Sequence, residues 1–468
     1  MTTIIVAILL IGYLAIATEH ITRINKAAVA MFLGVTGWIL YMVDGSEYIS
    51  RFYAADYQAF LDGTVSTAAT VKSYIANQVF LLHVANISQI VLYLLATMAI
   101  VEVLNSNGCF DFITDWIRTR NGKRLLWYLV LITFFLSANL DNLTTTVMML
   151  MIMRKIVSEK KYRMYLGSAI VIAANCGGCV TVIGDINSLM LWVKEAVTPG
   201  SYSTALFLPS LVAMVIPSYL ISRKIPEHID VELPRIIYRG DDSVLSYWQR
   251  GLMLFVGIGG LWFIPTFHSI TKLPPFVGAL CVLAVFWVVN ELMNSSLIKS
   301  NQPVSRTFPR TLQYENLQTI LYFIGISLAV GAIKETGAFA VAAEWINIHV
   351  HNIYVVGVVF GFISAILDNI AIVLSSISMY DVIASADLMP GMNWTYVSYF
   401  MQNGEYWKLI AFCGAVGGCL LPIGSIAGYA LMKSEKVSIW WYFRMISGKV
   451  LAGWIAGLLV YFVVNMAF

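Results

Sequence analysis

Two short stretches of the chain place a carboxylate beside an amide within long apolar segments. They read SANLDNLTTT (137–146) and SAILDNIAIV (364–373), and a third segment, GGCVTVIGDINSLM, carries another isolated aspartate. A carboxylate in hydrocarbon costs roughly 2.5–3.5 kcal/mol on insertion scales, so such a residue is by default a functional candidate. The three aspartates are Asp141, Asp185 and Asp368. A protonated aspartate that only joins helices by hydrogen bonds is the alternative for each.

Amides and hydroxyls accompany these aspartates, and the combination suits a hard cation such as sodium. A carboxylate that titrates near the working pH holds either a proton or a metal ion, and this competition produces exchange. Sodium and protons are therefore predicted to share Asp141, Asp185 and Asp368. The neutral ligands are predicted to be Asn142, Thr144, Thr145, Asn175, Asn187, Asn369 and Ser425. A helix cap or an interhelical hydrogen bond is an equal alternative for each neutral group.

Three other features in apolar segments have simpler alternatives. Glu102, near the cytoplasmic end of its predicted helix, is a candidate for proton access or pH response, and an ordinary interfacial glutamate is equally favoured. His83, at the outer start of the same helix, is interpreted as an interface histidine. The CGGC stretch (176–179) has a redox or zinc-like spacing. Its counterpart later in the chain keeps only Cys419, so tight packing at a helix break is favoured.

The elements that position these residues must be membrane helices. Of the 468 residues, 59% are hydrophobic and 12% are charged, whereas a soluble domain carries roughly 25% charged residues. The net charge of +3 reflects the orientation of loops and indicates no nucleic-acid partner. The first basic residues follow the first apolar run, which is the reverse of a signal peptide. The chain is thus predicted to be an all-α polytopic protein in the lipid bilayer, with both termini outside.

Basic residues in short loops mark the cytoplasmic side. Stretches with few of them, assigned to outer loops, are 44–84, 199–203, 269–275 and 381–407. About ten transmembrane helices are predicted, at 3–19, 27–43, 85–105, 164–198, 203–222, 251–268, 276–294, 317–334, 408–432 and 450–467.

Two apolar segments do not fit the expected alternation of loops between the cytoplasmic and the outer side of the membrane. Residues 125–153 have basic clusters at both ends, and residues 352–380 have few basic residues at either end. A straight helix of that length would span about 40 Å and emerge on the far side. Each segment is therefore predicted to fold back as a re-entrant hairpin, with an aspartate near its turn. Irregular backbone at that depth is tolerated where it lines a cavity, so the two turns indicate a site.

Three blocks of the first half recur, in order, in the second half. One pair begins LYLLATMAIVEVL and LYFIGISLAVGAI, the second pair is the two hairpins, and the third pair is GGCVTVIGDINSLM and GGCLLPIGSIAGYALM. Glycines interrupt both members of the third pair, which predicts broken helices. An odd number of crossings in each copy predicts two inverted-topology repeats, as in secondary transporters. The predicted parts are a first repeat (1–222; hairpin 125–153, broken helix 164–198), a cytoplasmic linker (223–250) and a second repeat (251–468; hairpin 352–380, broken helix 408–432).

The motifs resemble those of a known family. FFLSANLDNLTTTVMMLMIMRKI, VIAANCGGCVTVIGDINSLMLW, SAILDNIAIVLSSISMYD and GAVGGCLLPIGSIAGYALM are similar to segments of the NhaD-type sodium/proton antiporters of the ion transporter superfamily. That superfamily also contains arsenite permeases and dicarboxylate transporters. The resemblance covers nearly the whole chain.

The resemblance implies sodium or lithium efflux driven by proton entry, in a bacterial inner membrane, with no cofactor besides the transported ions. It also implies a homodimer whose transport domains move against a scaffold in an elevator-like way. The positions that match the family's polar motifs are Glu102, Asp141, Asn142, Asp185, Asp368, Asn369 and Ser425. The chain departs from the usual threonines or prolines of the family at Val182, Asn187, Ser188, Leu189, Ile370 and Ala371, which bears on ion selectivity and on the geometry of the breaks.

Two rival interpretations remain. An arsenite or dicarboxylate permease of the same fold is the first, although three central aspartates would repel a dicarboxylate. An intramembrane aspartyl protease is the distant second. That family carries two motifs, Gly-x-Gly-Asp and Tyr-Asp, and here Gly184 and Asp185 match the end of the first. The other half-motif would be Tyr380–Asp381, at a predicted membrane exit, and an inverted repeat has no role in proteolysis. The chain is therefore predicted to be a transporter and not an enzyme.

Overall fold

The computed structural model describes the whole chain except residues 114–116, 118, 230–244, 295–313, 385–393 and 468. Within the described residues the fold is helical, and its extended pairing is limited to isolated bridges. The helices form two compact units, each of which draws on both halves of the sequence. They are unit 1 (Met1–Leu92, Tyr314–Asn352 and Ala371–Asp381) and unit 2 (Tyr93–Gln313, Ile353–Ile370 and Val382–Phe468). Most of the predicted linker (223–250) lies outside the described residues.

Unit 1 is built around a close pair of helices, α3 and α17. Gly34 of α3 faces Gly325 of α17, and a Cβ atom on Gly34 would lie 2.7 Å from the carbonyl oxygen of Gly325. Small residues of this kind let membrane helices approach closely. The helices of this unit are α1 (Thr2–Ala17), α2 (Glu19–Thr22), α3 (Lys26–Val43), α4 (Gly45–Phe52), α5 (Ala54–Leu61), α6 (Ala68–Tyr74), η1 (Ile75–Phe80), the start of α7 (Leu81–Ser106), α17 (Tyr314–Glu335), α18 (Ala338–His349) and most of α20 (Asn369–Met379).

The stretch 44–84, predicted as an outer loop, is mostly helical, and its place on the outer side of the membrane stays a prediction. A capping box starts α6: the hydroxyl of Thr67 accepts from the amide of Thr70, and the Thr70 hydroxyl accepts from the amide of Thr67. The rings of Tyr57 and Tyr74, both buried, pack edge to face at 5.3 Å. The packing of these amphipathic turns on one another stabilises helices that have no continuous apolar stretch.

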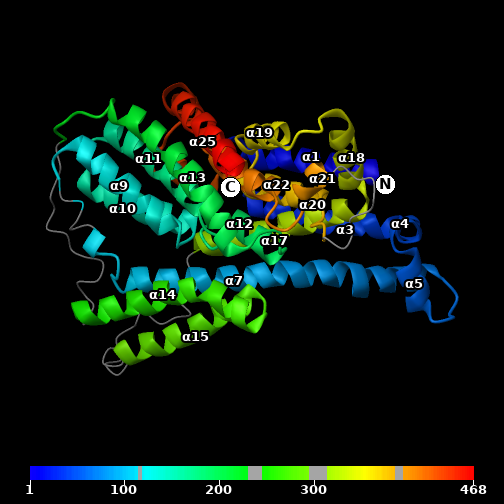
Figure 1. Ribbon diagram of the computed structural model, residues 1–468. Coiled ribbons are helices and arrows are strands. Elements are labelled where there is room, and N and C mark those ends of the chain that lie inside the picture. Colours follow the sequence, from blue (N-terminus) through cyan, green and yellow to red (C-terminus); the bar gives the residue numbers. More distant parts are fainter. Residues whose placement is uncertain (114–116, 118, 230–244, 295–313, 385–393, 468) are drawn as a thin grey trace. The chain divides into compact units, whose positions relative to one another are not determined.

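Unit 2 contains the remaining helices, most of which are labelled in Figure 1. In it α9 packs on α11, α19 packs on α22, and α13 packs on α25. The helices are the rest of α7, α9 (Gly122–Ser137), α10 (Asn142–Ile156), α11 (Lys160–Gly178), α12 (Ile186–Val193), α13 (Pro199–Ser222), α14 (Tyr247–Thr271), α15 (Pro275–Met293), α19 (Ile353–Ser364), α21 (Trp394–Ser398), α22 (Glu405–Gly417), α23 (Ile426–Glu435), α24 (Ile439–Tyr442), η4 (Phe443–Ser447) and α25 (Gly448–Ala467).

Helix is interrupted within all four segments for which a turn or break was predicted. Non-helical residues separate α9 from α10 (138–141), α11 from α12 (179–185), α19 from α20 (365–368) and α22 from α23 (418–425). An aspartate or a serine stands as the last residue of each interruption: Asp141, Asp185, Asp368 and Ser425. The relation of the two sets as inverted repeats stays a prediction.

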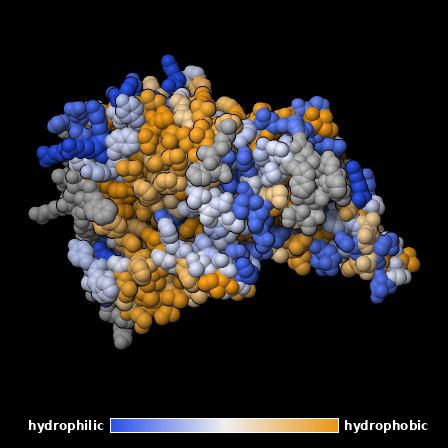
Figure 2. Space-filling model, viewed as in Figure 1, coloured by the Kyte–Doolittle hydropathy of each residue, from blue (hydrophilic) through white to orange (hydrophobic). Residues whose placement is uncertain are grey.

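The chain is a multi-pass membrane protein by the length and composition of its helices. Seven helices in the described part are long and apolar enough to cross a bilayer: Lys26–Val43, Ala68–Ser106, Pro199–Ser222, Tyr247–Thr271, Pro275–Met293, Leu317–Glu335 and Ile439–Asn465. Others predicted to cross are shorter or broken, such as α1. Apolar side chains cover the outer faces of α14 and α15 (Figure 2), among them the exposed Phe255 and Trp262. A surface of this kind indicates contact with lipid.

Candidate functional site

The interrupted helices of unit 2 meet through serine hydroxyls and closely approaching glycines. The hydroxyl of Ser137 donates to the carbonyl of Ala174 (2.6 Å), and the hydroxyl of Ser364 donates to the carbonyl of Gly414 (2.8 Å). A Cβ atom on Gly184 would lie 2.7 Å from the carbonyl oxygen of Ser137, so a larger residue would separate the two breaks. The glycines therefore serve close packing, as predicted for the CGGC stretch, and they bring the polar residues of separate breaks together.

Asp141 is the N-cap of α10. Its Oδ2 atom accepts from the amide of Thr144 (2.9 Å) and from the hydroxyl of the same residue (3.0 Å). An aspartate in this position satisfies a free amide of the first turn and interacts favourably with the positive end of the helix. The carboxylate of Asp141 is thus held at the break, and Thr144 acts as its hydrogen-bond donor.

A chain of polar side chains leads from Asp185 to the second half of the sequence. The amide of Asn142 donates to Oδ1 of Asp185 (3.3 Å) and lies 3.5 Å from Oδ1 of Asn175. The Asn187 amide donates to Oδ2 of Asp185 (2.9 Å). The Asn175 amide then donates to the hydroxyl of Ser425 (3.2 Å), which caps α23. Five of the predicted residues therefore lie in one buried network.

Asp368 and Asn369 lie at the remaining interruption, and both are buried. The carboxylate of Asp368 accepts from the backbone amide of Ile370 (3.1 Å), and the backbone amide of Asn369 donates to the carbonyl of Gly424 (3.1 Å). Both Asp141 and Asp368 lie near enough to Asp185 to interact with it electrostatically.

In the part of the chain that the structure describes, no three His, Cys, Asp or Glu side chains gather closely enough to hold one metal ion. Asp141 and Asp185 both line one narrow pocket, together with residues of α7, α12 and α14. The pocket offers about 20 Å³ to the centre of a water molecule, and about 10–15 Å³ by that measure holds one water. It fits a small ion or one or two waters.

The comparisons with known proteins agree with a transport site. The family model described as Citrate transporter (CitMHS) matches residues 6–395. The chain belongs to this transporter family. It is 34% identical over 457 residues to Sodium/proton antiporter 1 of Arabidopsis thaliana, covering 97% of this chain and 71% of the relative. Sodium/proton antiporter 2 of the same plant is 33% identical over 460 residues, covering 97% and 98%.

A bacterial relative of this transporter is Na+/H+ antiporter NhaD of Vibrio cholerae, with 26% identity over 388 residues, 78% of this chain and 75% of the relative. The resemblance to NhaD-type antiporters that the motifs indicate is confirmed by these relatives. The family and its named members are transporters, so the aspartyl protease interpretation is wrong. The plant relatives leave the membrane and the organism open.

Glu102 of the transporter lies in α7 and is buried, with 6% of its surface exposed. Its neighbour Val101 lines the pocket, whereas Glu102 itself does not. Its role in proton access or pH response stays a prediction.

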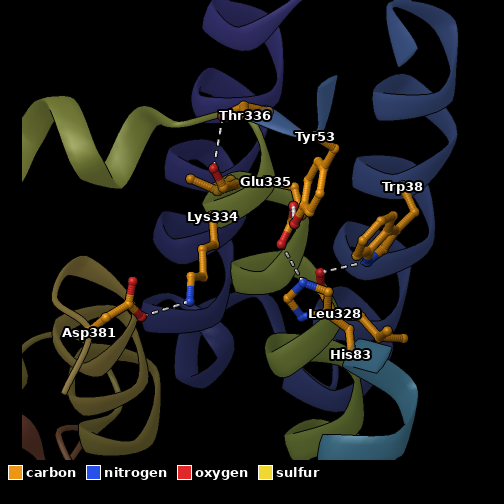
Figure 3. A network of polar contacts seen from close by, with 9 residues as sticks. Trp38, Tyr53, His83, Leu328, Lys334, Glu335, Thr336 and Asp381 are labelled. Carbon is orange, nitrogen blue, oxygen red and sulfur yellow. Dashed lines mark hydrogen bonds and ion pairs between the residues drawn. The ribbon is translucent and has the colours of Figure 1, made fainter. Parts of the chain in front are cut away.

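A second polar cluster, which no local pattern in the sequence indicates, lies in unit 1 of the transporter (Figure 3). The carboxylate of Glu335 pairs with Nε2 of His83 (2.7 Å) and accepts from the hydroxyl of Tyr53 (2.6 Å). The ring of Trp38 lies edge to face with His83 at 5.3 Å. Burial and the bond to Glu335 raise the pKa of Tyr53, so this hydroxyl stays a donor. His83 is therefore a partner in a network and more than an interface residue.

A third cluster joins three helices of unit 2. The carboxylate of Glu435, in α23, lies 2.9 Å from Nε of Arg163 and 3.3 Å from Nε of Arg154. Glu435 is buried and Arg163 is largely buried, whereas Arg154 is half exposed. The cluster links α10 and α11 to α23 near their basic ends. The sequence does not indicate this pairing, because the three residues resemble ordinary charges of cytoplasmic loops.

Proposed function

We propose that the protein exchanges sodium or lithium for protons across the membrane, and that cation and proton compete for its buried aspartates. The observation that carries the proposal is the narrow pocket lined by both Asp141 and Asp185. Its size suits a cation that has lost most of its water, and its charge favours a cation or a proton. The names of the relatives, sodium/proton antiporters from a plant and a bacterium, support the same substrates.

The second candidate is an anion carrier, which the description of the family as Citrate transporter favours. Arsenite and dicarboxylates belong to the same alternative. A carboxylate substrate would meet like charges at Asp141 and Asp185, with a strong repulsion in a poorly solvated site. Neutral arsenite escapes the charge argument, so it is included in the test.

The proposed mechanism is alternating access. Discontinuous helices that meet near the middle of the bilayer are typical of secondary transporters. The α9–α10 and α19–α20 pairs would be re-entrant hairpins from opposite sides, and the two halves would be inverted repeats. Close packing of α9 on α11 and of α19 on α22 supports that correspondence. A cation would then reach the aspartates from one side, and a proton from the other, through an elevator-like shift within a homodimer.

Within this mechanism the residues have distinct roles. Asp141, Asp185 and Asp368 bind the cation or the proton. Asn142, Thr144, Asn175, Asn187, Asn369 and Ser425 supply neutral ligands or hold the carboxylates in place. Glu102 serves proton access or pH response.

The test is cation-induced proton flux in everted membrane vesicles that contain the protein. Sodium and lithium are expected to release protons from wild-type vesicles, whereas potassium, arsenite, succinate and citrate leave the gradient unchanged. The variants Asp141→Asn, Asp185→Asn and Asp368→Asn are each expected to lose the flux. Asp62→Asn is the matched control, because Asp62 is exposed and its positive φ of 43° suits asparagine. Wild-type flux in all three variants would overturn the assignment.

A further inference from the structure

The wall of the pocket that α7 contributes carries a hydroxyl with no protein partner. Tyr93 lines the pocket with Asp141 and Asp185, and only 2% of its surface is exposed. Its hydroxyl has no hydrogen-bond partner among the residues that the structure describes. A buried hydroxyl that is left unpaired loses its hydration without compensation. Because Tyr93 shares this pocket with Asp141 and Asp185, its unpaired hydroxyl points to a ligand that is not part of the chain.

A second unpaired oxygen lies in the same pocket. Asn139, two residues before Asp141, also lines it. Its amide nitrogen donates to the carbonyl of Phe135 (2.6 Å), which fixes the orientation of the side chain. The remaining atom, Oδ1, is buried and has no donor among the described residues. The hydrogen bond to Phe135 leaves this oxygen as the free end of the amide.

A second hydroxyl on this wall, that of Thr97, donates to carbonyls of its own helix. A hydroxyl that donates keeps its lone pairs as acceptors. The pocket thus collects neutral oxygens from α7 and from the hairpin turn, next to the two carboxylates. Other unpaired buried hydroxyls, such as that of Tyr41, are not on the pocket wall. An unpaired hydroxyl and an unpaired amide oxygen, on residues that line one pocket with two acids, form a ligand set for a hard cation.

We propose that Tyr93 and Asn139 complete the cation site, as neutral ligands that replace water around an alkali cation bound by Asp141 and Asp185. This inference rests on the proposed function and adds specificity-determining residues to it. Neutral oxygens stabilise a bound cation and offer little to a proton, which binds a single carboxylate oxygen. Tyr93 and Asn139 therefore set the affinity for the metal ion relative to the proton.

The size of the ion should matter as well. A smaller cation is satisfied by fewer ligands and a tighter geometry. Sodium depends on the neutral oxygens more than lithium does, so their loss should shift the preference of the protein toward lithium. A water molecule bound to the same oxygens would produce no such selectivity.

The experiment measures sodium-induced and lithium-induced proton flux in vesicles with Tyr93→Phe and Asn139→Ala. Each variant is expected to raise the KM for sodium about tenfold, which corresponds to about 1.4 kcal/mol of lost binding, with a maximal rate within about twofold of the wild type. The KM for lithium is expected to rise less. Tyr41→Phe is the matched control, because it removes a buried and unpaired hydroxyl that does not line the pocket.

The outcomes separate this inference from the function on which it rests. Should wild-type vesicles exchange no alkali cation, the proposed function fails and this inference fails with it. Should the wild type exchange sodium and Asp185→Asn be inactive, while Tyr93→Phe and Asn139→Ala keep the wild-type KM for sodium, only this inference is overturned. An equal loss of maximal rate in Tyr93→Phe and Tyr41→Phe would also overturn it, because the effect would then be structural.

Discussion

Replacement of Asp141 by asparagine and by alanine separates its structural role from its proposed role in transport. Its Oδ2 atom caps α10 through the amide and the hydroxyl of Thr144, at 2.9 Å and 3.0 Å. Asparagine caps a helix about as well as aspartate, whereas alanine does not. Both substitutions remove the carboxylate. The difference in stability between Asp141→Asn and Asp141→Ala therefore isolates the cap.

The magnitude follows from the two hydrogen bonds. Loss of an N-cap costs about 1 kcal/mol, within a range of roughly 0.5–2 kcal/mol. Loss of the bond from the Thr144 hydroxyl adds roughly 0.5–1.5 kcal/mol. Asp141→Ala is thus expected to be less stable than Asp141→Asn by about 1–3 kcal/mol, whereas both variants lose sodium-induced proton flux because neither carries a carboxylate.

The assays are reversible unfolding of the purified protein in mixed detergent micelles and proton flux in vesicles. Equal stability of the two variants would refute the capping argument. Wild-type flux in Asp141→Asn, with an amide in place of the carboxylate, would refute the role of this charge in exchange. The capping role and the transport role of Asp141 are therefore tested by separate measurements.

Two further predictions concern stability alone. Arg163→Met is expected to destabilise the protein by about 3 kcal/mol, since it leaves the carboxylate of Glu435 buried with a weaker partner, and Arg154→Met by less than about 1 kcal/mol. Gly177→Ala is expected to cost roughly 1–3 kcal/mol, because its Cβ atom would overlap the backbone of α9, whereas Gly251→Ala, with open space around it, is expected to be neutral or slightly stabilising. Unfolding in detergent micelles measures all four variants.

Within each pair the second variant is the control. Similar losses in Arg154→Met and Arg163→Met would contradict the dependence on burial, and similar losses in Gly177→Ala and Gly251→Ala would contradict the packing argument.

The sequence carried enough information to predict the interrupted helices and most of the candidate site. The apolar run at 125–153 is too long for one crossing and has basic residues at both ends, so a turn near Asp141 followed from length and charge. Glycines within two other apolar segments predicted the helix breaks that end at Asp185 and Ser425. Segment length, flanking charge and glycines are local features of the sequence. They are informative here because a segment in a bilayer must satisfy its own backbone hydrogen bonds.

Other features depend on tertiary packing and had no local signal. Glu335 is a glutamate near a helix end in the sequence, and only the fold brings His83 and Tyr53 to it. The same is true of Glu435, whose partners lie far away in the chain. The short helices between 44 and 84 lack a long apolar stretch and are stabilised by contacts among aromatic rings. Tyr93 resembles any other helical tyrosine until the pocket shows its unpaired hydroxyl.

Competition between sodium and protons at the buried aspartates is tested most directly by calorimetric titration of the purified protein with sodium. Titrations at several pH values, in two buffers of different ionisation enthalpy, give both the Kd and the number of protons released. Ligand carboxylates must lose their protons to bind a metal ion, so the account predicts proton release on binding. For one displaced proton, the apparent Kd should rise about tenfold for each unit of decreasing pH in the acidic range. A Kd that is constant across this range, with no proton released, would contradict the account.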